Sequence, residues 1–400
     1  MSNATTIEPG AVTSALRPRD AADVAEMVAT HPRALEPVGG GALREVGHGT
    51  DADVLSLDAL AGVVAYEPEE LVLTALAGTP LAALERELAA HQQRLAFEPP
   101  DFGALLGVAR PHTIGGILSA NLAGSRRVSA GAARDHFLGC EAVTGRGERF
   151  KAGGRVVKNV TGYDVPKLLA GSWGTLAVLT SVTLRVAPLP ETERTLVVPS
   201  STADDAVAVM SAALGSPHDV SAAAFDAGRG CLLRLEGFAA SVDARGAALA
   251  RMLRAESGER GGWPARDAAL RRGDIGTVGA DESRALWAAI GGATALARWP
   301  VVWRISVPPT EAPRVLAALA PERYLLDWGG GLISAAFSVV DAARVRGALH
   351  EGHATLFKAP REARAANAVF QPQPAALAAA SRRVKRAFDP DGRLSPGRLG

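Results

Sequence analysis

The sequence predicts an α+β fold of two or three domains. Its 400 residues exceed what one small core requires, and 48% of them are hydrophobic, which is typical of globular proteins. Residues 1–190 are Gly-rich and alternate short strand-like runs with helical runs. Residues 191–375 carry the order strand–helix–strand–strand–helix twice, which predicts two ferredoxin-like half-sheets with helices on one face. Residues 376–400 form a separate C-terminal segment.

Local signals place the elements of the first stretch. The helical run over 20–31 starts on an aspartate N-cap, and the run over 81–91 follows a proline, which is a favourable helix start. The β-branched run over 175–186 predicts a strand pair that closes the domain. We place the boundary at Pro188 and Pro190, because proline cannot join a central ladder.

The second stretch repeats its order of elements. A strand over 195–199 leads to a helix over 203–214, and a strand over 301–307 leads to a helix over 312–319. Each helix is followed by two further strands and another helix. The Gly/Arg/Trp-rich residues 257–280 are predicted to form a loop between the two halves.

Charge and cysteine content exclude several classes of function. The 43 Lys and Arg residues balance the 42 Asp and Glu residues, so the chain has no nucleic-acid footprint. It has no run of eighteen apolar residues and no signal-peptide pattern, so we expect no transmembrane segment. Cys140 and Cys231 are too few for a disulfide framework or an iron–sulfur cluster. These features predict a cytoplasmic protein.

Three consecutive glycines, residues 39–41, follow a predicted strand. Bare amides in such a loop can converge on one point and bind an anion such as a pyrophosphate; a plain flexible turn is the alternative. The chain has no Walker sequence. A near match to the nicotinamide-dinucleotide fingerprint, at 145–147, has Phe150 in place of the third glycine. These mismatches argue against a doubly wound nicotinamide site.

Two later segments combine glycines with hydrogen-bonding side chains. In residues 110–127, RPHTIGGILSANLAGSRR, the backbone can approach a flat ligand, or the segment can be a buried helix start. Residues 156–180 contain a polar turn, a helix and a returning β-run. Lys158, Tyr163 and Asp164 of that turn are predicted to have a structural or partner-binding role.

In order and spacing, these three segments resemble the flavin-binding domain of the vanillyl-alcohol oxidase / p-cresol methylhydroxylase family. Their sequences are similar to those of the FAD-binding subunits of glycolate oxidases, in the segments PVGGGA, TIGG and KNVTGYDVPKLLAGSWGTLAVLTSVTLRV. The similarity covers residues 30–190 and the C-terminal tail, and reaches the middle by length and element order. It implies a two-subdomain FAD-binding domain of the p-cresol methylhydroxylase type over 1–190, followed by an α/β cap domain.

The resemblance also implies cofactor contacts. The loop whose amides hold the FAD pyrophosphate matches Gly39, Gly40, Gly41, Ala42 and Leu43. The segment along the pyrophosphate and the ribityl chain matches Thr113, Ile114, Gly115 and Gly116. The turn near the isoalloxazine matches Asn121 and Gly124, and a backbone contact to the flavin or its ribityl chain matches Val178.

Two departures from the family concern the loop and the tail. Members that attach flavin covalently use a loop histidine where this chain has Gly41-Ala42, and His48 lies beyond it, so we expect non-covalent FAD. The C-terminal helix is predicted to end at Asp389. The tail RLSPGRL then resembles a terminal Asn-Pro-Gly-Lys that returns to the flavin domain, with Ser395 for Asn and Arg398 for Lys.

The resemblance implies an FAD-dependent oxidoreductase that serves as a subunit of a glycolate-oxidising complex. The substrate would be a small 2-hydroxy acid, and the partners a sister FAD subunit and an iron–sulfur subunit. Such partners would allow peripheral association with the inner membrane. Two alternatives stay open: a self-sufficient FAD-dependent oxidase or dehydrogenase of another hydroxy acid or sugar-like alcohol, and a non-catalytic flavin-bearing scaffold.

No catalytic base is assigned, although several side chains are of the right type. A 2-hydroxy acid needs a cation on its carboxylate and a base on its hydroxyl. Candidates in the middle region are Arg304, Lys358, Arg361, His350 and His353. The last two could also form a metal pair, yet isolated histidines are more often structural.

Three arginines near the second glycine cluster have two interpretations. Arg126, Arg127 and Arg134 either stabilise an anionic flavin or form ion pairs with Asp135 and Glu141. The sequence favours neither interpretation.

Overall fold

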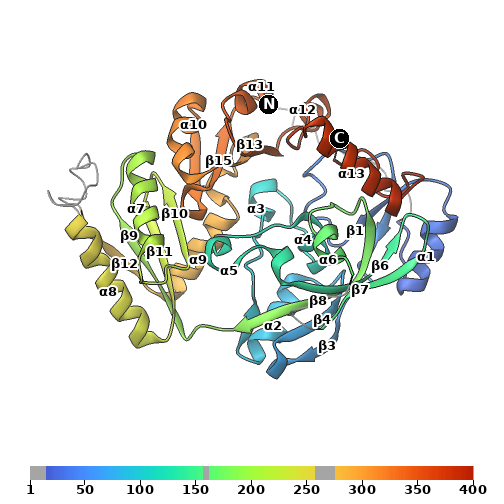
Figure 1. Ribbon diagram of the computed structural model, residues 1–400, viewed down its shortest axis with the longest axis horizontal. Coiled ribbons are helices and arrows are strands. Elements are labelled where there is room, and N and C mark those ends of the chain that lie inside the picture. The colour runs from blue at the N-terminus through green and yellow to red at the C-terminus, as the bar shows by residue number, and fades with distance from the viewer. Residues whose placement is uncertain (1–14, 156–161, 257–274, 400) are drawn as a thin grey trace, which may run out of the picture.

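The computed structural model describes residues 15–155, 162–256 and 275–399. Within these residues, the strands form sheets of two, six and eight strands. Figure 1 shows the eight-stranded sheet and its helices on the left and the two smaller sheets on the right. The mixture of helices and sheets confirms the predicted α+β class. Short 3₁₀ helices connect the elements: η1 (Pro68–Glu70), η2 (Ala133–His136), η3 (Thr294–Leu296), η4 (Pro309–Glu311) and η5 (Trp328–Gly330).

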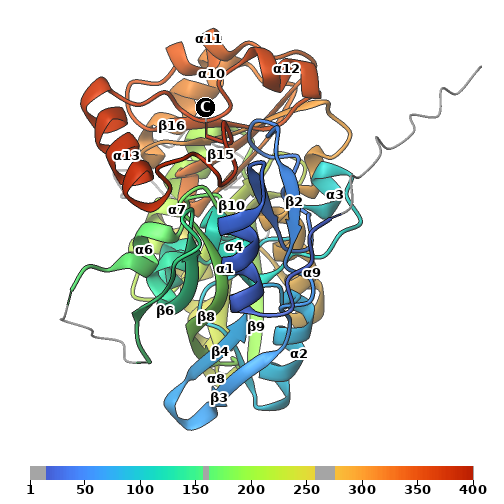
Figure 2. The ribbon, with the colours of Figure 1, turned by 90° about the vertical axis from the view of Figure 1, so that its right-hand side faces the viewer.

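The two-stranded sheet consists of β1 (Leu35–Val38) and β2 (Asp53–Ser56), which run parallel. Helix α1 (Ala21–Thr30) packs against it (Figure 2). The Asp20 side chain accepts hydrogen bonds from two amides of the first turn, which confirms the predicted N-cap. The shared core contains Val24, Val28, Leu35, Leu55 and Leu394.

The six-stranded sheet is antiparallel and is built around one long strand. Its members are β3 (Val63–Glu67), β4 (Val72–Leu76), β5 (Gln93–Leu95), β6 (Phe137–Thr144), β7 (Arg149–Gly153) and β8 (Ala177–Pro188). The prediction of a strand pair over 175–186 is wrong, because this run contains no glycine, proline or asparagine to break it and continues as the single strand β8. Strand β8 pairs with β4 on one side and β6 on the other.

In the described part of the chain, five short α-helices lie between the strands of this sheet in the sequence. They are α2 (Leu81–Ala90), α3 (Gly103–Leu106), α4 (Ile114–Ala120), α5 (Arg127–Ala130) and α6 (Val165–Leu169). Of these, α2, α4 and α6 contact the strands of the sheet. Helix α2 begins directly after Pro80, as predicted. Helix α4 packs on β8, and its hydrophobic side chains belong to the core of the six-stranded sheet.

The eight-stranded sheet confirms the repeated order of elements. The first half contains β9 (Thr192–Val198), α7 (Ala203–Gly215), β10 (Ala222–Asp226), β11 (Gly230–Gly237) and α8 (Ala239–Glu256). The second half contains β13 (Val301–Ser306), α10 (Ala312–Leu319), β14 (Arg323–Asp327), β15 (Leu332–Phe337), α11 (Ala342–Gly347) and β16 (His353–Lys358). Because β10 pairs with β14, the two halves form one continuous antiparallel sheet.

The two faces of this sheet have different partners. Alternate residues such as Ala223 and Phe225 pack under the helices, whereas Ala222 and Ala224 join the core of the six-stranded sheet. Helix α9 (Ala280–Gly291) lies on this second face. Part of the predicted loop over 257–280 is a strand, β12 (Gly276–Val278), which pairs with β9. Residues 257–274 lie outside the described residues.

The C-terminal segment returns to the two-stranded sheet. Helices α12 (Arg361–Ala366) and α13 (Ala375–Phe388) precede it, and α13 ends at its C-cap Asp389, as predicted. The Leu35 amide donates to the Arg393 carbonyl oxygen (2.7 Å), and the Ser395 amide donates to the Leu35 carbonyl oxygen (2.9 Å). The tail therefore joins β1 through an isolated parallel β-bridge between Leu35 and Leu394.

Candidate functional site

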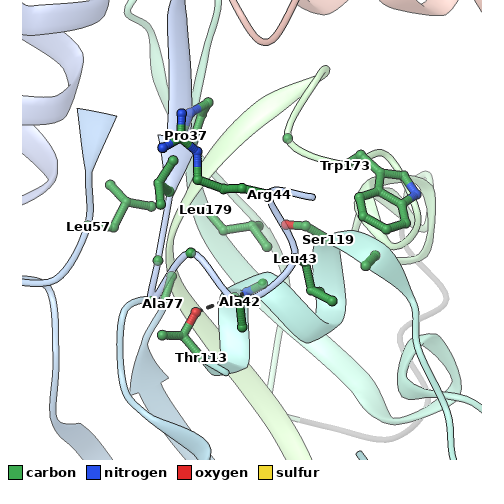
Figure 3. A pocket seen from close by; sticks show the side chains of 18 of the residues that line it. Pro37, Ala42, Leu43, Arg44, Leu57, Ala77, Thr113, Ser119, Trp173 and Leu179 are labelled. Atoms are coloured by element: carbon green, nitrogen blue, oxygen red, sulfur yellow. Dashed lines mark hydrogen bonds between the residues drawn. The ribbon is translucent and has the colours of Figure 1, made fainter. Parts of the chain in front are cut away.

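A cleft opens where the loop after β1 meets the start of α4 (Figure 3). It holds about 770 Å³ up to its open mouth. The loop, the segment before and within α4, the turn at Trp173 and the C-terminal tail line it. Figure 3 shows Trp173 at the opposite end of the cleft from Leu57.

The loop presents free backbone amides to this cleft. Among the described residues, none accepts a hydrogen bond from the amides of residues 39–43. The next amides along the chain are different, because Arg44 N and Val46 N donate to carbonyl oxygens within the loop (3.3 and 3.0 Å). Consecutive free N–H groups in a turn form a concave anion site. This loop can therefore hold a diphosphate.

Close packing explains why the loop consists of glycine. A Cβ atom on Gly40 would lie 1.8 Å from the Pro111 carbonyl oxygen, and one on Gly39 would lie 2.1 Å from Thr113 Oγ1. Gly41 has φ of +82°, a left-handed conformation that favours glycine. The loop thus lies directly on the segment that leads into α4.

Helix α4 gives the cleft its shape. Thr113 caps the helix, and its Oγ1 accepts a hydrogen bond from Gly116 N (3.3 Å). The remaining amides of the first turn are also occupied, since Ile114 N donates to Thr79 O (3.0 Å) and Gly115 N to Ala77 O (2.9 Å). The free donors in the cleft therefore come from the loop and not from the helix.

Two arginines that line the cleft, Arg44 and Arg398, stabilise the loop. Arg44 forms an ion pair with the buried Glu36 (2.5 Å), and Arg398 of the tail binds the same carboxylate. Arg398 also donates to the carbonyl oxygens of Arg44 and Val46 (3.0 Å each). Burial lowers the pKa of Arg398, and the neighbouring Glu36 opposes that effect. Sequence reasoning missed Arg44, although its position three residues after Gly41 was a signal.

The cleft brings together most of the predicted cofactor residues. It is lined by Gly39, Gly40, Gly41, Ala42, Leu43, Thr113, Gly115 and Gly116. Ile114 and Val178 are fully buried and do not line it, although both chain neighbours of Val178 do. Asn121 lines a second cavity instead. Gly124 lies behind that cavity, where its carbonyl oxygen accepts a hydrogen bond from Trp328 Nε1 (3.0 Å).

The second cavity adjoins the cleft and shares Ala120 and Trp173 with it. It holds about 1,260 Å³ up to its open mouth. One wall is the eight-stranded sheet, where Arg304 and His353 project from β13 and β16. Partial desolvation and the charge of Arg127 lower the pKa of His353 below its ordinary value.

Of the predicted substrate-binding candidates, Arg304 and His353 reach this cavity and the others do not. Lys358 Nζ donates to a backbone carbonyl oxygen (2.6 Å). His350 lies on the surface, 3.5 Å from a glutamate carboxylate, and Arg361 is exposed at the start of α12. In the part of the chain that the structure describes, no three potential metal ligands cluster, so nothing there completes a metal site with the histidine pair.

The three arginines near the second glycine cluster have different surroundings. In the described residues, no ion pair joins Arg126, Arg127 or Arg134 to Asp135 or Glu141, which contradicts the ion-pair interpretation. The Arg127 guanidinium lies over the Trp328 ring (4.5 Å to its centroid) and lines the second cavity. Arg126 is buried beside Glu98, and Arg134 is exposed.

The polar turn before α6 is described in part. Lys158 lies outside the described residues. The Asp164 side chain caps α6 by accepting a hydrogen bond from Lys167 N (3.3 Å), which gives it a structural role. The Tyr163 side chain is 95% exposed and lines neither cavity.

The fold and the cleft define a flavoprotein. Residues 12–153 match the family described as "FAD binding domain", and this range contains the glycine loop and α4. The fold of alkyldihydroxyacetonephosphate synthase is similar, with a TM-score of 0.62 and 14% sequence identity over 96% of this chain and 78% of that chain. The chain is an FAD-binding oxidoreductase.

The chain belongs to the family of the glycolate oxidase subunit GlcE. It is 33% identical to GlcE of Escherichia coli (strain K12) over 340 residues, which cover 84% of each chain. It is also 35% identical over 130 residues to glycolate oxidase subunit GlcD of Bacillus subtilis (strain 168), across 32% of this chain and 27% of GlcD. A D-lactate dehydrogenase of Anaerostipes hadrus is 32% identical over 157 residues, across 39% of this chain and 31% of that protein.

Among the described residues, no helix combines the length and the apolar character needed to span a bilayer.

Proposed function

We propose that this chain is the FAD-binding subunit of a complex that oxidises glycolate to glyoxylate and passes the electrons to partner subunits. One observation carries the proposal: a row of free amides at residues 39–43 lines a cleft that opens onto a second, cationic cavity. The family relationship to a glycolate oxidase subunit supports the choice of substrate.

In this proposal the loop amides of residues 39–43 hold the FAD diphosphate, and α4 supports the cofactor along its length. Bound FAD supplies the acceptor for the hydride that leaves the alcohol carbon of the substrate. The cofactor is held without a covalent bond, because residues 39–43 have no nucleophilic side chain. His48 lies further along the loop, where its Nε2 accepts a hydrogen bond from Val369 N (3.2 Å).

The partners proposed are a sister FAD subunit and an iron–sulfur subunit. The whole sequence has two cysteines, which are too few to hold an iron–sulfur cluster. Both cysteines are buried, and burial raises the pKa of Cys140 and of Cys231 to about 12, so neither is a ready thiolate ligand. Electrons that leave the flavin therefore need an acceptor outside this chain.

A visible absorbance spectrum of the purified chain tests the cofactor, and anaerobic addition of glycolate tests the reaction. We expect a yellow protein whose flavin bleaches with glycolate when the partner subunits are co-expressed. Bleaching of the chain alone would identify a self-sufficient dehydrogenase. A flavin that stays oxidised in the full complex would identify a scaffold, and a colourless chain that takes up no FAD would overturn the proposal.

A further inference from the structure

The second cavity contains a half-buried cation, Arg304, that forms no ion pair within the described residues. Among the described residues, the Arg304 guanidinium has no hydrogen-bond partner and no carboxylate within 4 Å. It is held by aromatic rings instead, at 5.1 Å from the ring centroid of Phe102, 5.4 Å from Phe357 and 5.8 Å from Trp328. These contacts fix the orientation of the guanidinium but leave its N–H donors unused.

The nearest acid, Asp327, forms no ion pair with this guanidinium. Asp327 ends β14, which β15 separates from β13, and its carboxylate accepts hydrogen bonds from Ser125 Oγ (2.8 Å) and from Trp328 N (2.7 Å). Burial raises the pKa of Asp327 to about 6, and the charge of Arg304 opposes this rise. Burial likewise lowers the pKa of Arg304 to about 10, which leaves it charged at neutral pH.

The rest of the cavity adds positive charge and no negative charge. The Arg127 guanidinium also lies over the Trp328 ring (4.5 Å to its centroid), and its side chain forms no hydrogen bond within the described residues. The lining residues include no Asp or Glu. Two guanidinium groups that line one cavity without a carboxylate favour an anionic ligand, which supplies the opposite charge.

We infer that Arg304, with Arg127 beside it, forms a binding site in this chain for the carboxylate of a small 2-hydroxy acid. The planar guanidinium can donate two parallel hydrogen bonds to a carboxylate. The cavity adjoins the cleft at Ala120 and Trp173, so the bound acid lies next to the cofactor site. The identity of the acid rests on the proposed function. The existence of the anion site rests only on the geometry of the cavity.

Calorimetric titration of the FAD-loaded chain tests this site, with glycolate and oxalate as probes and glycolamide as the uncharged control. We expect saturable binding of both anions and none of glycolamide. Arg304→Gln should weaken anion binding at least tenfold, and Arg304→Lys should restore part of it, because lysine keeps the charge without the fork. The matched control is Arg314→Gln on α10, whose guanidinium already pairs with Glu311 (2.6 Å) and should leave binding unchanged.

Flavin content and circular dichroism of each variant establish that it is folded. Absence of anion binding to the FAD-loaded wild type would overturn the inference, as would equal binding by a folded Arg304→Gln variant and the wild type. Failure of the proposed function would give a different result. The chain would bind the anions but take up no FAD, or it would bind them in the full complex without bleaching of the flavin by glycolate.

Discussion

At the scale of single residues, the cofactor cleft depends on a contact between two loops that are far apart in the sequence. The glycines at 39 and 40 bring the backbone onto Pro111 and Thr113 so closely that a Cβ atom has no room. This contact leaves the amides of the loop turned toward the cleft, where no protein acceptor among the described residues uses them. Loss of one glycine should therefore affect cofactor binding more than folding.

Gly40→Val tests this contact. The added atoms overlap the Pro111 carbonyl oxygen, so the loop must move away at a local cost of roughly 1–3 kcal/mol. We expect a folded protein that has lost its flavin absorbance. Gly49→Val is the matched control, because a Cβ atom there meets nothing within 4 Å. A Gly40→Val variant that retains FAD would contradict the role given to the loop.

At the scale of elements, the C-terminal tail is part of the two-stranded sheet. Its hydrogen bonds to Leu35 form a parallel β-bridge beside β1, and Leu394 is fully buried with the valines of α1. Arg398 then reaches the glycine loop from the same tail. The sheet and the loop are therefore held by residues from opposite ends of the chain.

Leu394→Ala should destabilise the protein by about 2–5 kcal/mol, because it leaves a cavity in this small core. We also expect weaker FAD binding, since the tail supports the loop. Urea unfolding and FAD titration measure the two effects. Leu399→Ala in the same tail removes a side chain that is 44% exposed and should change neither. Equal stability of the two variants would show that the tail is not part of the core.

At the scale of the whole molecule, buried ion pairs join the two large sheets. Glu236 of β11 pairs with Arg94 of β5 (2.5 Å), and Arg234 of β11 donates to both carboxylate oxygens of Glu98 (2.8 and 3.1 Å). Burial acts to raise the pKa of Glu236, but the charges of Arg234 and Arg94 outweigh it and lower the pKa to about 2. The ionised form of Glu236 thus stabilises the contact between the sheets.

Stability should therefore fall in acid. A carboxylate with a lowered pKa contributes stability above its ordinary pKa of 4.5, and this contribution is lost as the pH falls toward 2. For Glu236 the shift corresponds to on the order of 3 kcal/mol. Urea unfolding between pH 6 and pH 3 should show a smaller loss for Glu236→Gln than for the wild type. Glu282→Gln, at an exposed position of α9, should behave as the wild type. Equal pH dependence of Glu236→Gln and the wild type would contradict this account.

Patterns within short segments were enough for much of the fold and part of the site. The N-cap at Asp20, the end of α13 and the repeated order of elements depend on neighbouring residues, so they could be predicted. The glycine loop was also visible, because three consecutive glycines signal a special backbone. The single strand β8 was misjudged, since one long strand and two short ones have the same β-branched composition.

The sequence by itself determined the class of elements, the glycine loop and the resemblance to flavoproteins. Only the tertiary structure decided which charges meet. It placed Arg304 and Arg127 on one cavity, paired Arg398 with Glu36, and joined the two half-sheets through β10 and β14. The physical reason is that these contacts join residues far apart in the chain, and their energies depend on burial and distance, which no local pattern encodes.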